Sequence, residues 1–498
     1  MKLITSKILK EFDLNSFRTD LSLYLRICEF FKMKIENKEI PPHSLLPSTR
    51  NLAEKLSVSR STIIKAYDFL ILEGFIESKK GAGYWVSDRE TYFSPHEEID
   101  EEINYPELSK KGKSFQENVS LINSTSEKFV AFRPGLPPLD IFPVNQWKKL
   151  SNLYWRNIKS SALSYSDSSG IEALKKNIAN YLNLIRGIKC DHHQVIIVSG
   201  SLQSLYLVGN ALLNTGDTMV MENPTFPNVH SIFRSLQANI KALPIDDEGI
   251  MLDKLQLTEK EKPKLLHVTP SNHYPTGIQM SKKRKLEVLE WAHKNESIII
   301  ENDYDHEISN WRTKNESLFS LDHENRTVYL GTFNRLLHPS IRLGYMVVPY
   351  YLLEVIKALQ KHSHRFVSPS NQVVMSQFIE KNHLYNHVKN VVSIAEERKE
   401  IFLKNFKEHF NENITIKPSQ ARSLHILAEL PDTISDKEIS NVFYHQNIIA
   451  HPYSKCFINT EKEGLIFGYS CVRNPVISKK INKMARIFNP KSEELLQH

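Results

Sequence analysis

The chain has 498 residues, of which 41% are hydrophobic and 24% charged, and its formal net charge is +7 at pH 7. This length exceeds one ordinary domain, and the composition is that of globular protein with sizeable cores. No apolar run approaches the roughly 20 residues that a helix needs to cross a bilayer, and the first residues lack the apolar core of a signal peptide. We therefore expect a cytoplasmic protein. Its four cysteines, Cys28, Cys190, Cys456 and Cys471, have no CxxC spacing, which predicts neither a disulfide framework nor a metal site.

Residues 21–86 have the pattern of three helices followed by a short hairpin. Ser48 and Ser59 are expected to be the N-caps of two short helices separated by a tight turn, and Gly74 is expected to end the second of them. Two short helices that meet in this way describe a helix-turn-helix, whose second helix can enter the major groove of DNA. Residues 75–86 alternate in polarity around a basic, glycine-bearing tip, which predicts a wing lying against phosphates.

Three segments carry a resemblance to a known DNA-binding domain: Leu-Pro-Ser-Thr-Arg-Asn-Leu-Ala at 46–53, Val-Ser-Arg-Ser-Thr-Ile at 58–63 and Leu-Glu-Gly-Phe-Ile at 72–76. They resemble the GntR family across the whole unit, for which we take residues 1–88. The resemblance implies DNA contacts from Ser48, Arg50, Arg60, Ser61, Thr62, Lys79, Gly81 and Gly83. Residues 1–88 hold 14 Lys and Arg against 11 Asp and Glu, so the DNA-facing charge must be local. Taken singly, each cation also fits a solvated surface charge.

Residues 89–126 are expected to be an acidic flexible linker. They hold 4 Lys and Arg against 8 Asp and Glu, and a polar segment with so few apolar residues cannot bury enough surface to fold alone. The acidity would keep this segment off DNA. Contact with the basic face of the DNA-binding unit is the alternative.

From residue 127 to residue 498 short apolar runs alternate with helical patterns. The expected strands are 194–199, 218–221, 265–269, 297–301, 328–330 and 346–348, and helices are expected over 202–213 and 283–294. This alternation predicts an α/β sheet with helices on both faces. In such sheets ligands bind at the carboxyl ends of the strands.

Residues 327–345 form the segment on which function depends, because two expected strands flank a polar turn. The segment resembles the cofactor-lysine region of fold-type I aminotransferases, as MocR-type regulators of the GntR family carry it, where Gly-Thr-Phe-Ser-Lys leads into Pro-x-x-Arg-x-Gly-Tyr. Segments 132–147, 200–203, 222–226, 270–277 and 301–305 extend the resemblance over residues 129–490. It implies that residues 127–498 are an aminotransferase class I/II-like effector and dimerisation domain.

Substitutions at three positions separate this chain from the family chemistry. Asn334 and Arg335 stand where the family has Ser-Lys, and the family lysine forms a Schiff base with pyridoxal phosphate because an amine can lose its proton. Arginine cannot lose its proton in a protein, so we expect no covalent attachment of pyridoxal phosphate and no catalytic lysine. Asn302 stands where the resemblance implies the carboxylate under the pyridine nitrogen, and a neutral amide holds that proton poorly. A one-residue slip that puts Asp303 under the ring stays open.

The resemblance implies a wider cofactor site. Ser201, the amide of Leu202, Thr332 and Arg342 would hold the phosphate, Phe226 would stack on the ring, and Tyr304 would bond the ring hydroxyl. The implied cofactor-binding set is Ser201, Leu202, Phe226, Tyr274, Asn302, Tyr304, Thr332, Arg335 and Arg342. Ile466 stands near the position of a substrate-carboxylate arginine.

The sequence thus predicts a DNA-binding transcriptional regulator, a homodimer acting on a double-stranded operator. Its aminotransferase-like domain would sense pyridoxal phosphate without a covalent bond, or another anionic metabolite, and would lack transaminase activity. An active pyridoxal phosphate-dependent aminotransferase fused to a DNA-binding domain is one alternative, and it requires a substitute for the lysine. A ligand-free dimerisation module is the other.

Overall fold

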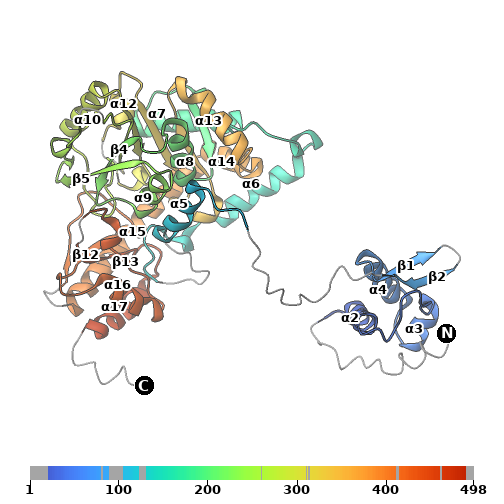
Figure 1. Cartoon of the computed structure of the whole chain (residues 1–498). Helices are drawn as coiled ribbons and strands as arrows, with labels where there is room; N and C mark the ends of the chain where they lie inside the picture. Colours follow the sequence, from blue (N-terminus) through green and yellow to red (C-terminus); the bar gives the residue numbers. More distant parts are fainter. Residues whose placement is uncertain are drawn as a thin grey trace. The chain divides into compact units, whose positions relative to one another are not determined.

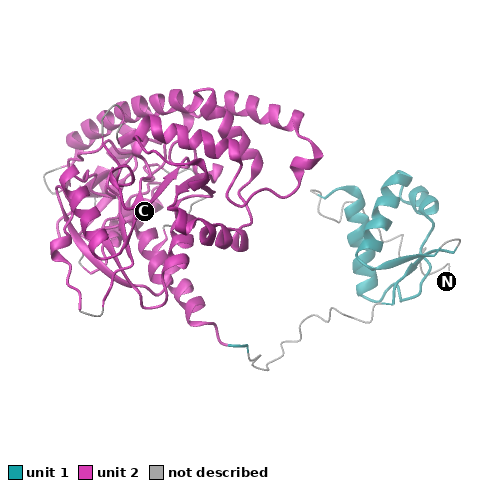
Figure 2. Cartoon of the chain, turned by 90° about the horizontal axis from the view of Figure 1, so that it is seen from above, with its two compact units in different colours: residues 1–106 teal, residues 107–498 magenta. Residues whose placement is uncertain are grey.

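The computed structural model describes residues 21–79, 82–88, 105–122, 131–258, 261–309, 311, 315–410, 414–459 and 462–488. The chain divides into two compact units, unit 1 at Met1–Pro106 and unit 2 at Glu107–His498 (Figures 1 and 2). In the part of the chain that the structure describes, no helix is both long and apolar enough to cross a membrane.

Unit 1 is a winged helix-turn-helix, as the sequence predicts. Its elements are α2 (Leu23–Glu36), α3 (Thr49–Lys55), α4 (Arg60–Leu72), β1 (Ile76–Lys79) and β2 (Gly83–Val86). The hydroxyl of Ser48 accepts the backbone N–H of Asn51 at 3.2 Å, and that of Ser59 accepts the N–H of Thr62 at 3.1 Å. These caps satisfy amides that have no partner within the helix. Buried side chains from all three helices, including Phe31, form the core of the unit.

The main sheet of unit 2 has eight strands. They are β3 (Val195–Val198), β4 (Thr218–Asn223), β5 (Asn239–Asp246), β6 (Gly249–Ile250), β7 (Leu265–Val268), β8 (Ile298–Asn302), β9 (Thr327–Thr332) and β10 (Gly344–Val347). Their order is β3-β10-β9-β8-β7-β4-β5-β6. The pairs from β9 through β8, β7 and β4 to β5 are parallel, and β10 runs antiparallel to both of its neighbours. Every residue of β7, β8, β9 and β10 is buried, which explains why these strands read as continuous apolar runs.

Helices cover both faces of this sheet (Figure 1). The helices of unit 2 are α5 (Lys110–Asn118), α6 (Val144–Asn157), α7 (Glu172–Arg186), α8 (Ser201–Leu212), α9 (Pro227–Ser235), α10 (Lys282–Lys294), α11 (His306–Ser309), α12 (Leu318–Leu321), α13 (Tyr350–Ser363), α14 (Pro369–Glu380), α15 (His383–His409), α16 (Asp436–His445) and α17 (Asn474–Phe488). Successive strand residues point to opposite faces, so Ile197 packs in the cluster of α7 and α14, and Ile196 in the cluster of α8, α9 and α13.

A second, smaller sheet lies in the C-terminal part of unit 2. It contains β11 (Thr415–Ile416), β12 (Ile426–Glu429), β13 (His451–Pro452) and β14 (Gly464–Phe467), all antiparallel, in the order β11-β12-β14-β13. Phe402 of α15 and Phe467 of β14 pack in the same core cluster, with ring centroids 5.9 Å apart.

The C-terminal part of the expected linker, 89–126, differs from the prediction of a flexible segment. Residues from 107 onward belong to unit 2, where α5 packs on α9 and makes side-chain contacts with α8. The Ser114 hydroxyl donates to the carbonyl of Arg234 at 3.2 Å, and the rings of Phe115 and Tyr206 lie 6.1 Å apart. One half-buried aromatic side chain and a few polar contacts hold α5 against the rest of unit 2. A count of charged residues over the whole segment does not reveal such individual contacts.

Candidate functional site

A cavity of about 150 Å³ opens where β8 and β9 end and α8 begins. Its lining residues are Gly200, Ser201, Leu202, Leu205, Phe226, Asn228, Val229, Asn302, Tyr304, Thr332, Asn334, Arg335 and Arg342. Eight of the nine residues that the resemblance implies as cofactor contacts are therefore joined here by five others, of which sequence reasoning singled out only Gly200 and Asn334. Two of the described lining residues are arginines and none of them is acidic, so the cavity favours an anion.

One end of the cavity is a cup of hydrogen-bond donors. Gly200, at φ +145°, directs the chain into α8, so the first amides of this 12-residue helix face the cavity end together with Ser201. Thr332 contributes a hydroxyl from the end of β9, and Arg342 contributes a guanidinium. Helix N-termini and arginine are the groups that bind phosphate in proteins. The residues present fit a phosphate group at this end.

Asn334 braces the cup. Its Nδ2 donates to the carbonyl of Ser199 at 3.2 Å, and its Oδ1 accepts the backbone N–H of Leu343 at 2.9 Å. This side chain therefore joins the residue after β3 to the residue before β10. The sequence offers only an asparagine in a polar turn, which is a common turn residue, so the brace could not be predicted.

Aromatic side chains form the other end of the cavity. The rings of Phe226 and Tyr274 lie 4.3 Å apart, although Tyr274 is not among the cavity-lining residues. The Tyr304 hydroxyl donates to the carbonyl of Asn272 at 2.9 Å, which leaves its lone pairs available as acceptors. The predicted ring-binding residues thus come together from three separate segments.

Arg335 lies among these rings. Its Cζ is 5.4 Å from the ring centroid of Phe226 and 5.0 Å from that of Tyr304, in cation–π geometry with both. On another side it lies against Gly135, where an added Cβ would be 1.8 Å from Nη1. Arg335 has no hydrogen bond or ion pair with any other residue that the structure describes. Among the described residues, none therefore uses its guanidinium donors.

Asn302 borders the cavity, and Asp303 does not. The Nδ2 of Asn302 is 3.2 Å from Nε2 of His267, and its Oδ1 has no partner among the described residues. Asp303 turns away to accept hydrogen bonds from Arg186 Nε at 2.9 Å and Nη2 at 2.6 Å. Burial opposes ionisation of Asp303, but Arg186 holds the pKa of this carboxyl below its usual value. The geometry therefore gives no support to a register slip that puts Asp303 at the cavity.

Burial shifts the pKa values of three groups behind the cavity toward their neutral forms. Burial lowers the pKa of His267 to about 3 and raises the pKa of Glu222 to about 8. Burial also raises the pKa of Asp305 to about 7, against the pull of the nearby Arg335. Ile466 is fully buried in an apolar cluster with Tyr304 and supplies no cation. A neutral amide is therefore the polar group that a ligand meets at the end of β8.

Five of the eight predicted DNA contacts of unit 1 lie in its helix-turn-helix. Ser48, Arg50, Arg60 and Ser61 are exposed at the starts of α3 and α4. The Nε of Arg60 donates to Thr49 Oγ1 at 3.4 Å, which joins the two helices.

The remaining predicted contacts are Thr62 and the wing. Thr62 is half-buried. Lys79 pairs with Gly83 across the wing, and its Nζ is 5.7 Å from the centroid of the Trp85 ring. Gly81 lies outside the described residues.

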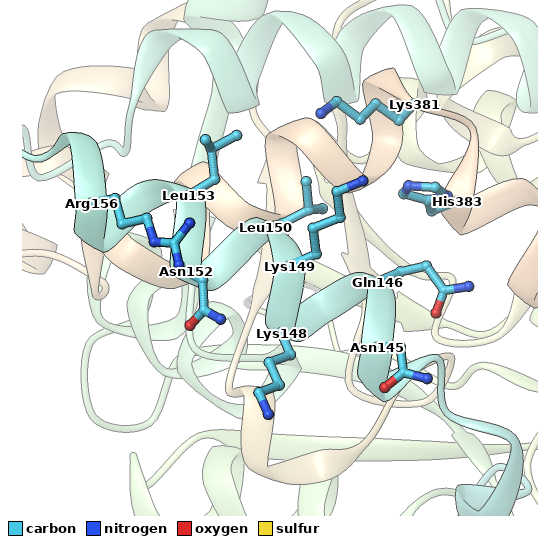
Figure 3. A pocket seen from close by; sticks show the side chains of 10 residues that line it. All are labelled: Asn145, Gln146, Lys148, Lys149, Leu150, Asn152, Leu153, Arg156, Lys381 and His383. Atoms are coloured by element: carbon cyan, nitrogen blue, oxygen red, sulfur yellow. The ribbon is translucent and has the colours of Figure 1, made fainter.

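Two other features of unit 2 carry no site chemistry. An open hollow of about 530 Å³ lies beside α6 and the turn between α14 and α15 (Figure 3). It is larger than the cavity described above, but its lining consists mainly of Asn, Gln and Lys side chains on the surface. The sequence predicts no metal site, and the structure brings Asp191, His192 and His193 within 4.8 Å of one another. Asp191 is already used there to cap a turn, accepting the N–H of His193 at 2.8 Å.

Comparison with known proteins identifies both units. Residues 23–86 match the family described as bacterial regulatory proteins, gntR family, and residues 134–462 match aminotransferase class I and II. The probable rhizopine catabolism regulatory protein MocR of Rhizobium meliloti is 27% identical over 94% of this chain and 94% of its own length. The HTH-type pyridoxine biosynthesis transcriptional regulator PdxR of Corynebacterium glutamicum is 25% identical over 76% of this chain and 78% of its own length.

Solved structures support the same fold for unit 2. The kynurenine aminotransferase of Pyrococcus horikoshii superposes with a TM-score of 0.67 at 24% identity, over 78% of this chain and 98% of that one. The fold of the aminotransferase class I and II family implies dependence on pyridoxal phosphate. The chain belongs to this family through unit 2 and to the GntR family through unit 1, and it is a MocR-type transcriptional regulator.

Proposed function

We propose that this regulator binds a double-stranded operator through unit 1 and senses an anionic ligand in the cavity of unit 2, without transaminase activity. The observation that carries the proposal is the composition of the cavity, in which a phosphate cup stands beside Asn302 and Arg335. The cup supports binding of a phosphate-bearing ligand. Arg335 cannot act as the amine nucleophile that transamination needs.

Pyridoxal phosphate fits this site only in part. Ser201, Thr332, Arg342 and the α8 amides suit its phosphate. The ring end does not suit it, because a neutral amide replaces a carboxylate and the Arg335 guanidinium lies over both aromatic rings. We therefore propose that any binding of pyridoxal phosphate to this chain is non-covalent.

Absorbance and mass spectrometry test the loss of covalent chemistry. Wild type and the Arg335→Lys variant are mixed with pyridoxal phosphate and treated with borohydride. The mass of each protein is then measured by mass spectrometry. We expect a reduced adduct on the lysine variant at residue 335 and none on wild type, because only the lysine has an amine that can be deprotonated. A stable adduct on wild type would mean that another lysine serves, and the active aminotransferase would become the better proposal.

Gel-shift binding tests the operator proposal, using DNA upstream of the coding region of this protein. Arg60 is exposed at the start of α4, and we expect Arg60→Ala to weaken binding by about tenfold or more, since one base or phosphate contact contributes roughly 1–3 kcal/mol. Lys404→Ala, an exposed change on α15 of unit 2, is the control and should bind like wild type. Equal binding by Arg60→Ala and wild type would count against the proposal.

We also propose that the regulator is a homodimer in the cytoplasm. Exposed apolar side chains of unit 2 support self-association, since Trp155 and Leu153 of α6 are 58% and 42% exposed, and Leu163 and Tyr165 shortly after it are 65% and 77% exposed. Sedimentation equilibrium of the full chain should give twice the 57.7 kDa chain mass. A monomer at micromolar concentration would contradict the dimer.

A further inference from the structure

We infer, on the basis of the proposed ligand-sensing function, that Arg335 closes the aromatic end of the cavity and that the ligand is a small hydroxylated phosphate monoester without an aromatic ring. The cup would hold the phosphate, and Arg335 would contact the same ligand from the opposite end. This assigns to the site a different ligand class from that of the aminotransferase fold.

The position of the Arg335 guanidinium supports this ligand class. It lies over the faces of Phe226 and Tyr304 at 5.4 and 5.0 Å, and a guanidinium is planar and weakly hydrated, so it stacks on aromatic faces much as a flat ring does. Gly135 supports it from a third direction, because any side chain at this position would collide with Nη1. Arg335 is thus packed into the space that a stacked ring would need.

The small size of the remaining cavity supports the same ligand class. Its volume is about 150 Å³, a size that holds about one benzene-sized molecule. Sites for larger ligands usually measure about 300–1,000 Å³. A phosphate with a short carbon chain fits this space, whereas a phosphate together with a substituted pyridine ring needs Arg335 to leave.

The polarity of the cavity lining also supports a phosphate monoester. Two arginines border the cavity, and no acidic side chain does so among its described lining residues, which suits the charge of about −1.5 to −2 on a phosphate monoester at pH 7. Asn302 is 7% exposed and its Oδ1 has no described partner. A hydroxyl on the ligand both donates and accepts, so it satisfies this amide whichever of its two atoms faces the cavity.

Isothermal titration calorimetry on the full-length protein tests the inference with two probes. Glycerol 3-phosphate represents the small hydroxylated ester, and 4-deoxypyridoxine 5′-phosphate carries the ring but no aldehyde, so covalent chemistry cannot contribute. We expect wild type to bind glycerol 3-phosphate at least about tenfold more tightly than the ring phosphate. Inorganic phosphate should compete with both probes for the cup.

Two variants separate the volume of Arg335 from its charge. Arg335→Ala empties the aromatic end, and we expect about tenfold tighter binding of the ring phosphate with weaker binding of glycerol 3-phosphate. Arg335→Met keeps most of the volume without the charge, so it should lose affinity for glycerol 3-phosphate and gain little for the ring phosphate. Thermal unfolding of each variant confirms that it is folded before titration.

The inference is overturned if wild type prefers the ring phosphate, or if Arg335→Ala weakens the binding of both probes equally. Its failure can be told apart from failure of the proposed function. Should neither probe bind wild type while pyridoxal phosphate still alters operator binding in a gel shift, ligand sensing stands and the present inference falls. If no phosphate compound binds or alters operator binding, both fall.

Discussion

Among the single residues near the cavity, Glu222 is a carboxyl whose charge is suppressed by burial. Glu222 is fully buried and accepts both the N–H and the hydroxyl of Thr269 on one oxygen, at 3.0 and 2.7 Å. Burial raises its pKa to about 8. The carboxyl therefore stays protonated near neutrality, and it adds no negative charge behind the anion-binding cavity.

This raised pKa makes a prediction about the pH dependence of stability. Because the folded state keeps a proton that the unfolded state releases above pH 4.5, Glu222 reduces stability as pH rises toward 8. The slope from one such group is up to about 1.4 kcal/mol per pH unit. Glu222→Gln keeps the acceptor without the titration, so its free energy of unfolding should fall less than that of wild type between pH 7 and 8, and the buried histidines contribute equally to both proteins. Equal slopes in urea unfolding would refute this account.

The ion pair of Arg186 with Asp303 predicts a large loss of stability when it is broken. Both side chains are almost wholly buried, at 1% and 0% exposure. Removing one partner leaves a buried, unpaired charge, which costs about 3–5 kcal/mol. We expect this loss for Arg186→Met in guanidinium unfolding. Lys176→Met is the control, because the Lys176–Glu172 pair is exposed on α7 and should change stability little. Similar effects of the two changes would contradict the burial argument.

Among the elements of unit 2, helix α5 has a polar sequence and nevertheless packs on other helices of the unit. Phe115 contacts Tyr206 of α8, and Ser231 of α9 donates a hydrogen bond to the carbonyl of Asn118 at 2.8 Å. Neither contact creates a helical stripe of apolar residues. The docking of α5 therefore depends on a few contacts, of which Phe115 supplies the apolar one.

Phe115→Ala should undock α5 while leaving the rest of unit 2 folded. The change removes a half-buried ring, at a cost of roughly 1–2 kcal/mol, and this cost falls on a short segment whose local stability is low. We expect faster amide hydrogen exchange over residues 110–118 and unchanged exchange in β7 and β8. Gln116→Ala, on the exposed side of α5, is the matched control. Unchanged exchange in α5 would show that its polar contacts suffice.

At the scale of the whole molecule, the two compact units have separate cores. Separate cores predict separate unfolding transitions in scanning calorimetry. Operator DNA should raise only the transition of unit 1, and a cavity ligand only that of unit 2, because each binds one folded unit. One transition that shifts as a whole with either ligand would show instead that the two units unfold together.

The expected start of the second domain at residue 127 differs from the start of unit 2 at Glu107. The helix caps at Ser48 and Ser59 and the buried strands near β3, β4, β7, β8, β9 and β10 could be predicted from the sequence alone. These features depend on local chemistry and periodicity, so a short window of residues carries the full signal. Motifs at residues 331–345 and 301–305 also located the cavity, because the carboxyl ends of neighbouring parallel strands must meet at one edge of the sheet.

Tertiary contacts determine which groups face that cavity and which partners form hydrogen bonds with them. Whether Asn302 or Asp303 borders it depends on Arg186, which lies more than a hundred positions earlier in the chain and draws Asp303 away. The place of Arg335 over two rings depends on Phe226, Tyr304 and Gly135 from three other segments. The docking of α5 likewise depends on α8 and α9. Contacts between segments distant in the sequence leave no local pattern, and for this reason the fold can be foreseen from the sequence more fully than the chemistry of the site.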